Sequence, residues 1–167
     1  NVNDQPTGAM VINGLARQGE TLQANQAFSD DDGLTGQFVY QWFRDGEEIS
    51  GADGLSYTLT QADVGAQISV TAFYTDAQGK DEQVSSALTA VVANRNDAPT
   101  GEVRIDGDLQ LGQMLTAIPD IHDLDGVSNP FSYQWYRGET AIAGATDASY
   151  QLQQADVGEQ IWVEVRY

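Results

Sequence analysis

The sequence repeats itself with an offset of 93 residues, and this constrains the fold more than any other feature. Asn3-Asp4-x-Pro6-Thr7-Gly8 recurs at Asn96–Gly101, Tyr40-Gln41-Trp42 recurs at Tyr133–Trp135, and Gln61–Gly65 recurs at Gln154–Gly158. The two copies align without a gap, and about 33 of 72 aligned positions are identical. We therefore expect two copies of one structural unit, residues 1–95 and residues 96–167.

Within each copy, short segments of alternating apolar and polar residues lie between turn-forming residues, which is typical of an all-β sandwich. In the first copy this pattern predicts strands near Ala9–Asn13, Thr21–Phe28, Phe38–Arg44, Glu47–Ser50, Ser56–Thr60, Gln67–Thr75 and Glu82–Val92. Seven strands with a tryptophan on the third match the immunoglobulin pattern, without its disulfide because the chain has no cysteine. The predicted fold class is all-β, with two tandem immunoglobulin-like β-sandwiches.

The second copy is shorter than the first. It ends at Tyr167, the counterpart of Tyr74, so the last predicted strand has no counterpart in residues 96–167. A sandwich without that strand is expected to expose the edge of its sixth strand. Two explanations stay open. The chain was cut at this position, or the strand comes from elsewhere, as it would if residues 96–167 were the first part of a split domain.

Composition argues against several functional classes. The chain has 25 Asp and Glu residues against 7 Lys and Arg, a formal net charge of -18 that is shared at about -9 per copy. So acidic a surface repels nucleic-acid phosphates, and no apolar run approaches the roughly 18 residues of a membrane span. The single histidine, His122, has no cysteine partner and no nucleophile motif beside it. We expect no nucleic-acid partner, no membrane insertion and no enzymatic activity.

Three motifs taken together resemble a known family. They are the linker Asn94-Arg95-Asn96-Asp97-Ala98-Pro99-Thr100-Gly101, the Tyr-Gln-Trp motif followed by an arginine, and Ser-Tyr-x-Leu-x-Gln-Ala-Asp-Val-Gly. Over essentially its whole length the chain resembles the tandem immunoglobulin-like, cadherin-like repeats of large bacterial surface adhesins of the repeats-in-toxin (RTX) type. The resemblance implies calcium-rigidified extender domains of a secreted protein, which act in cell adhesion or biofilm formation at the bacterial cell surface. Some members of that family carry an immunoglobulin-like domain split by an inserted ligand-binding domain.

Carboxylates and amides gather near the linker between the copies. In an immunoglobulin topology the loop after the fifth strand lies at the C-terminal end of a domain, and the loop after the second strand lies at the N-terminal end. The junction would then bring together Asp63, Asn94, Asn96, Asp97, Asp123 and Asp125, with Asp120 close in sequence. Ca²⁺ takes about six to eight oxygen ligands and offsets the repulsion between converging carboxylates. We predict a Ca²⁺ site here, similar in makeup to the cadherin inter-domain site.

A second, outer Ca²⁺ site is predicted at the start of the chain. Its candidate ligands are Asn1, Asn3, Asp4, Asp30, Asp32 and Asp76. A structural alternative applies to both sites, because Asn-Asp-x-Pro forms turns on its own through Asx side chains that bond the nearby backbone. Asp63 can likewise accept backbone N–H groups within its own turn.

Two groups of aromatic residues are assigned different places. Trp42 and Trp135, together with Tyr40 and Tyr133, are predicted to lie in the cores. Tyr136 and Trp162 are predicted to point outward on neighbouring strands, where they would form a platform for a glycan or protein ligand or simply a cross-strand contact. The primary prediction is a calcium-rigidified spacer whose partners are neighbouring repeats of the same chain. The alternative is a ligand-binding module that uses this platform or carries a binding insert.

Overall fold

The computed structural model describes residues 3–34 and 36–167, and the chain divides into two compact units, Asn1–Arg95 and Asn96–Tyr167. Both units consist of antiparallel sheets, so the prediction of an all-β fold is confirmed. A single turn of 3₁₀ helix occurs in each unit, η1 (Gln61–Asp63) and η2 (Gln154–Asp156). In the part of the chain that the structure describes, no helix is long and apolar enough to cross a membrane.

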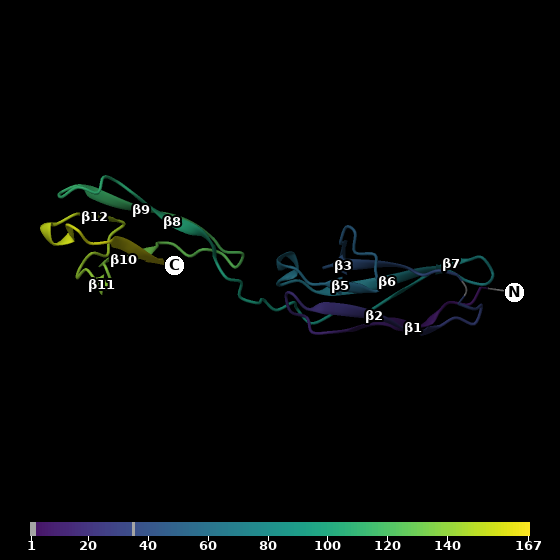
Figure 1. Cartoon of the computed structure of the whole chain (residues 1–167). Helices are drawn as coiled ribbons and strands as arrows, with labels where there is room; N and C mark the ends of the chain where they lie inside the picture. The colour runs from purple at the N-terminus through teal and green to yellow at the C-terminus, as the bar shows by residue number, and fades with distance from the viewer. Residues whose placement is uncertain (1–2, 35) are drawn as a thin grey trace. The chain divides into compact units, whose positions relative to one another are not determined.

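The first unit has two sheets, of order β1-β2-β5 and β4-β3-β6-β7. Figure 1 shows β1 and β2 in one layer and β3, β6 and β7 in the other. This pairing is that of an immunoglobulin-like sandwich, in which inward side chains from both sheets form the core. The strand bounds are β1 (Thr7–Asn13), β2 (Thr21–Ser29), β3 (Val39–Arg44), β4 (Glu47–Glu48), β5 (Ser56–Thr58), β6 (Ile68–Thr75) and β7 (Asp81–Ser85).

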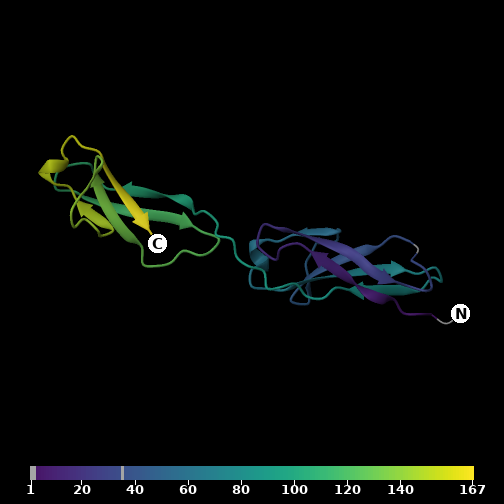
Figure 2. The same cartoon turned by 90° about the horizontal axis from the view of Figure 1, so that it is seen from below.

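The second unit repeats this arrangement up to the sixth strand, with sheets of order β12-β9-β8 and β11-β10-β13. Its strands are β8 (Thr100–Asp106), β9 (Met114–His122), β10 (Ser132–Arg137), β11 (Thr140–Ala141), β12 (Ser149–Gln151) and β13 (Ile161–Arg166). In Figure 2 the yellow strand β13 runs beside β10 toward the C-terminus. Within residues 96–167, all of which are described, no strand pairs with the other edge of β13.

The Tyr-Gln-Trp motif builds the core of each unit. Trp42 is fully buried and its indole N–H donates to the main-chain oxygen of Gly54 at 2.9 Å. The preceding Gln41 donates from its amide to the main-chain oxygens of Trp42 and Ile49, both at 2.8 Å. In the second unit Trp135 and the glutamine before it make the corresponding bonds. The core positions predicted for the two tryptophans are confirmed, since both are fully buried.

The last strand of the first unit is shorter than predicted, because β7 ends at Ser85. Beyond it, Ser86 and Thr89 use their hydroxyl oxygens to accept the N–H groups of Val70 and Ile68, each at 3.0 Å. Their own N–H groups donate to the main-chain oxygens of the same two residues at 2.9 Å. Side-chain oxygens thus replace main-chain carbonyls, so the regular ladder stops although the segment still follows β6.

Candidate metal centre at the N-terminal end of each unit

In the first unit, three acidic residues are joined by hydrogen bonds at the start of β1. The N–H of Asp4 donates to Asp32 Oδ2 at 2.6 Å, and the N–H of Asp32 donates to Asp30 Oδ1 at 2.9 Å. The hydroxyl of Tyr74, from β6, donates to Asp30 Oδ2 at 2.6 Å. The loop that follows β2 is therefore tied both to the chain entering β1 and to the opposite sheet.

The second unit repeats these bonds. Asp97 N–H donates to Asp125 Oδ2 at 2.7 Å, Asp125 N–H donates to Asp123 Oδ1 at 2.8 Å, and Tyr167 donates its hydroxyl to Asp123 Oδ2 at 2.5 Å. The Tyr167 and Asp125 donors lower the pKa of Asp123 below its usual value. The same carboxylate raises the pKa of Tyr167 to about 12. In each unit the structure thus brings the predicted loop aspartates next to the aspartate of the Asn-Asp-x-Pro motif.

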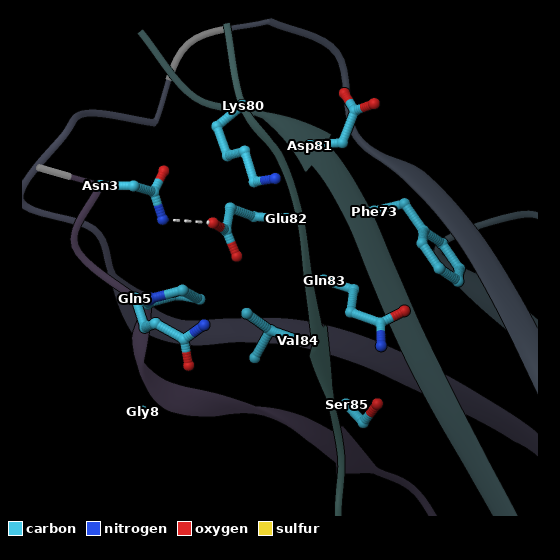
Figure 3. Close-up of a pocket in the computed structure, with 11 residues that line it drawn as sticks. Asn3, Gln5, Gly8, Phe73, Lys80, Asp81, Glu82, Gln83, Val84 and Ser85 are labelled. Atoms are coloured by element: carbon cyan, nitrogen blue, oxygen red, sulfur yellow. Dashed lines mark hydrogen bonds between the residues drawn. The ribbon is translucent and has the colours of Figure 1, made fainter. Parts of the chain in front are cut away.

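Among the described residues, three buried side-chain oxygens have no hydrogen-bond donor: Gln61 Oε1 on the turn η1, and one oxygen each of Asn3 and Asp76. Asp76 is only 4% exposed; its Oδ1 accepts the N–H groups of Gln78 and Lys80, both at 2.8 Å, while its Oδ2 is buried without a partner. Asn3 donates from Nδ2 to Glu82 Oε1 at 2.8 Å, which leaves its Oδ1 buried and unpartnered. Figure 3 shows the Asn3 amide directed toward Glu82 across a pocket of about 670 Å³.

Negative charge concentrates around Tyr74. Burial first, then its hydrogen bond to Asp30, and then the charges of Asp30, Glu82 and Asp76 raise the pKa of the Tyr74 phenol well above its usual value. Unpaired buried acceptors beside several carboxylates lack a donor or a cation, and a set made only of oxygen atoms suits Ca²⁺. Among the described residues, however, no three acidic or histidine side chains already converge as a metal cage. The candidate ligands are all oxygen atoms, which is the type that calcium prefers. One of them is already engaged, because Gln78 Nε2 donates a hydrogen bond to a carboxylate oxygen of Asp32.

The other predicted ligands lie on the surface or outside the described residues. Asn96 donates from Nδ2 to the main-chain oxygen of Asp97 at 3.0 Å, the kind of local Asx contact that the structural alternative expects. Asn94 is exposed. Asp120 is exposed and lies 3.2 Å from His122 Nε2. Asn1 lies outside the described residues.

Asp63 has a different role from the predicted one. Its fully buried carboxylate accepts from Arg44 Nε at 2.8 Å, from the Tyr57 hydroxyl at 2.9 Å, and from the N–H and hydroxyl of Thr60 at 2.6 and 2.8 Å. Burial alone would raise the pKa of Asp63, but the bonds from Thr60, Arg44 and Tyr57 hold it below its usual value. The prediction of Asp63 as a calcium ligand is corrected, because both oxygens already serve its own unit.

The second copy repeats this arrangement. Asp156 accepts from Arg137, from the Tyr150 hydroxyl at 2.8 Å and from the N–H of Gln153 at 2.7 Å. Burial acts to raise the pKa of Asp156, but these donors keep it below its usual value. The repeated Gln-Ala-Asp-Val-Gly motif is thus explained by an aspartate that locks its turn to the third and fifth strands of its own unit.

Tyr136 and Trp162 lie directly opposite each other on β10 and β13. Their ring centroids are 4.0 Å apart and the planes differ by 5°, so the two rings stack on each other. Trp162 is 43% exposed and its indole N–H donates to the main-chain oxygen of Gly138 at 2.7 Å. The outward direction predicted for Trp162 is confirmed, and the contact between the rings is the predicted cross-strand pair. Whether the pair also binds a ligand stays a prediction.

At the N-terminal end of the first unit, Glu82 is a candidate ligand that was not predicted from the sequence. It lies half-buried on the edge strand β7, where alternation alone gives no sign that its carboxylate reaches Asn3. It is identified only by its hydrogen bond to Asn3, a residue far from it in the sequence.

Comparison with known proteins adds little. No family model matches the chain, and no curated protein matches it. Among solved structures, the three N-terminal domains of the bacteriophage RB49 Highly Immunogenic Outer Capsid protein (Hoc) are similar at 18% identity with a TM-score of 0.34. That alignment covers 95% of this chain and 54% of the Hoc chain, so this chain spans about half of its length. A TM-score this low carries no argument about fold or function.

Proposed function

We propose that this chain is a calcium-stiffened spacer from a secreted bacterial surface adhesin, as its resemblance to RTX adhesin repeats implies. The observation that supports calcium binding is the pair of buried, donor-free oxygens of Asn3 and Asp76 at the N-terminal end of the first unit. Buried acceptors are almost always paired in native proteins. A bound cation would satisfy both of them and offset the surrounding negative charge.

The residues that would hold calcium in the first unit are Asn3, Asp4, Asp32, Asp76 and Glu82. Calcium supplies positive charge and a flexible oxygen coordination sphere. The protein residues supply the position, because Asp4 and Asp32 are already joined by a 2.6 Å hydrogen bond and Asn3 and Glu82 by one of 2.8 Å. An ion held there would fix the entering chain against the loops of the sandwich.

In the second unit the corresponding residues are Asn96, Asp97 and Asp125. Asp97 directly follows the linker, so an ion held by it would remove conformational freedom from the segment between the repeats. With about -9 of formal charge on each unit, removal of the ion would leave like charges to repel at that segment. A spacer needs such stiffness to keep its shape over many repeats, and its partners in this proposal are neighbouring repeats of the same chain.

An extracellular location follows from this proposal. Calcium sites of extracellular modules typically have dissociation constants of about 10⁻⁴ to 10⁻³ M, which only the calcium concentration outside cells would saturate. At about a hundredfold excess over the dissociation constant, one ion that binds only the folded state stabilises it by about 2.7 kcal/mol. For a unit of this size that corresponds to a rise in Tm of roughly 10–20 °C.

The test uses the full chain and two matched variants. Thermal unfolding is followed with about 10 mM CaCl₂ and with EDTA, a range that spans the affinities expected for extracellular modules. Wild type is expected to gain stability in calcium, and Asp76→Asn is expected to lose most of that gain in the first unit. Asp31→Asn removes the same charge from an exposed position of the neighbouring loop, the one that follows β2, and is expected to keep that gain. Solution scattering in the same buffers measures whether the linker stiffens.

Two outcomes separate the parts of the proposal. If wild type shows no change in Tm or in calcium-bound NMR signals at about 10 mM calcium, the calcium site is rejected. If calcium binds and stabilises the first unit but the scattering profile is unchanged, the site stands and the spacer mechanism is rejected.

A further inference from the structure

The turn between β6 and β7 is organised by Asp76. Its Oδ1 accepts the N–H groups of Gln78 and Lys80, both at 2.8 Å, and its own N–H donates to the main-chain oxygen of Lys80 at 2.8 Å. The next residue, Ala77, donates its N–H to the main-chain oxygen of Gly33 at 3.2 Å. The turn is therefore fixed against the loop that follows β2, and the backbone of Gln78 is fixed with it.

Gln78 donates hydrogen bonds to two buried carboxylates. Its N–H donates to Asp76 Oδ1 at 2.8 Å, and its side-chain Nε2 donates to Asp32 Oδ1. Asp76 is 4% exposed and Asp32 is 7% exposed. The other oxygen of Asp32 accepts the N–H of Asp4 at 2.6 Å. Each oxygen of Asp32 thus has an N–H donor, whereas Asp76 Oδ2 has none.

The two donors to Asp32 differ in how easily they can leave. The Asp4 N–H belongs to the main chain entering β1, so it cannot withdraw unless that segment moves. Gln78 is exposed, and its side chain can turn into water, where the amide regains hydrogen bonds. An amide N–H and a cation compete for one carboxylate oxygen, because both present positive charge to it. The Gln78 amide is therefore the group that a cation would displace.

We propose that the Gln78 side chain is an internal competitor of calcium that sets the affinity of the site in the first unit. This inference rests on the calcium site of the proposed function and adds the residue that regulates it. Without calcium, the amide offsets the charge of Asp32 and stabilises the unit. Calcium must break that hydrogen bond to use Asp32 Oδ1, so part of its binding free energy is lost to the displacement.

The size of the effect follows from a closed thermodynamic cycle. Gln78→Ala removes the hydrogen bond from the calcium-free state only, because the bond is already broken when calcium is bound. Loss of a hydrogen bond to a charged group should tighten calcium binding about tenfold, which equals about 1.4 kcal/mol. The calcium-free stability should fall by the same amount, which lowers the Tm of the unit by roughly 5–10 °C. The stability at saturating calcium should not change.

The test measures both sides of this cycle in the full chain. Calcium is titrated into wild type and Gln78→Ala, and binding to the first unit is followed by the NMR amide signals of residues 76–80. Thermal unfolding, followed by the indole N–H signal of Trp42 in the core of the first unit, is measured in EDTA and in saturating calcium. Gln23→Ala, at an exposed position near the other end of β2, is the matched control and should leave both measurements unchanged.

A second variant separates the N–H donor from the bulk of the side chain. Gln78→Glu keeps the length of the side chain but removes the donor and adds a carboxylate. It should bind calcium at least as tightly as Gln78→Ala and should be the less stable of the two in EDTA, because two carboxylates then face each other. If Gln78→Ala tightened binding and Gln78→Glu weakened it, bulk rather than the hydrogen bond would oppose the ion, and the proposal would be wrong.

Other results would also overturn the proposal, each in a recognisable way. Equal losses of Tm with and without calcium, at unchanged affinity, would make Gln78 a structural residue only. Weaker binding in Gln78→Ala, with a loss of stability at saturating calcium, would make its amide oxygen a ligand instead of a competitor. If wild type responds to calcium and Gln78→Ala responds identically, this inference alone fails. If neither responds at about 10 mM calcium, the proposed function fails together with it.

Discussion

Replacement of Asp63 by alanine should unfold the first unit far more readily than an ordinary loss of charge. The carboxylate is completely buried and holds Arg44, Tyr57 and Thr60 together. Asp63→Ala removes the acceptor of all these donors at once. It leaves the Thr60 N–H and the hydroxyl of the half-buried Tyr57 without this acceptor.

The magnitude follows from the burial of each partner. Loss of one member of a buried ion pair costs about 3–5 kcal/mol of unfolding free energy. The Arg44 side chain retains 33% exposure and can turn to water, which places the expected loss near the lower end, about 3 kcal/mol. For a domain of this size, such a loss lowers the Tm by roughly 10–20 °C.

Urea unfolding followed by the indole N–H signals of Trp42 and Trp135 measures the two units separately, since one tryptophan lies in each core. The midpoint reported by Trp42 should fall in Asp63→Ala, while that reported by Trp135 should stay. Glu48→Ala, at an exposed strand position, is the control and should change the stability by less than about 0.5 kcal/mol. If Asp63→Ala behaved like this control, the assignment of Asp63 as a structural lock would be refuted.

Three further predictions concern the second unit. Gly101 has φ +104° and an added Cβ would lie 1.9 Å from the Asp120 carbonyl oxygen, so Gly101→Ala should cost at least about 2–3 kcal/mol in denaturant unfolding. Because the pKa of Asp156 is lowered in the folded state, its contribution to stability is present above about pH 4 and lost as the pH falls through the folded-state value. Asp156→Asn should therefore be less stable than wild type at pH 7, and its stability should depend less on pH below about pH 4. Measurement of Tm against pH checks both expectations. Trp162→Ser should cost no more than about 1 kcal/mol, because it removes a surface stack with Tyr136 rather than core packing.

Much of the fold could be predicted because its signals are local and occur twice. The alternation of Phe38, Tyr40 and Trp42 defines an inward face, and the same alternation returns at Tyr133 and Trp135. The 93-residue offset then predicts the residue range of each strand of the second unit from that of its counterpart in the first. The end of β7 could not be predicted, because it depends on two hydroxyl groups that intercept N–H groups of a different strand.

The candidate site was predictable only in part. Asp63 and Asp76 are the same residue type in turns of similar composition, and nothing local distinguishes them. What differs is the set of donors within reach. Arg44 and Tyr57 arrive from β3 and β5 and saturate Asp63, whereas Asp76 Oδ2 meets none. Such differences arise from tertiary packing, which a single sequence does not reveal.

Repetition of an acidic residue in both copies is therefore not, by itself, a sign of a metal. Four aspartates that recur at the 93-residue offset each accept a tyrosine hydroxyl within their own unit, in the pairs Tyr74–Asp30, Tyr167–Asp123, Tyr57–Asp63 and Tyr150–Asp156. These hydrogen bonds within each unit are enough to explain why the four aspartates recur. The proposed calcium site rests instead on two buried oxygens without hydrogen-bond donors at this end of the unit, those of Asn3 and Asp76. It follows that Asp63→Ala should destabilise the first unit equally with and without calcium. Asp76→Asn should instead remove most of the calcium dependence of the first unit and leave its calcium-free stability almost unchanged.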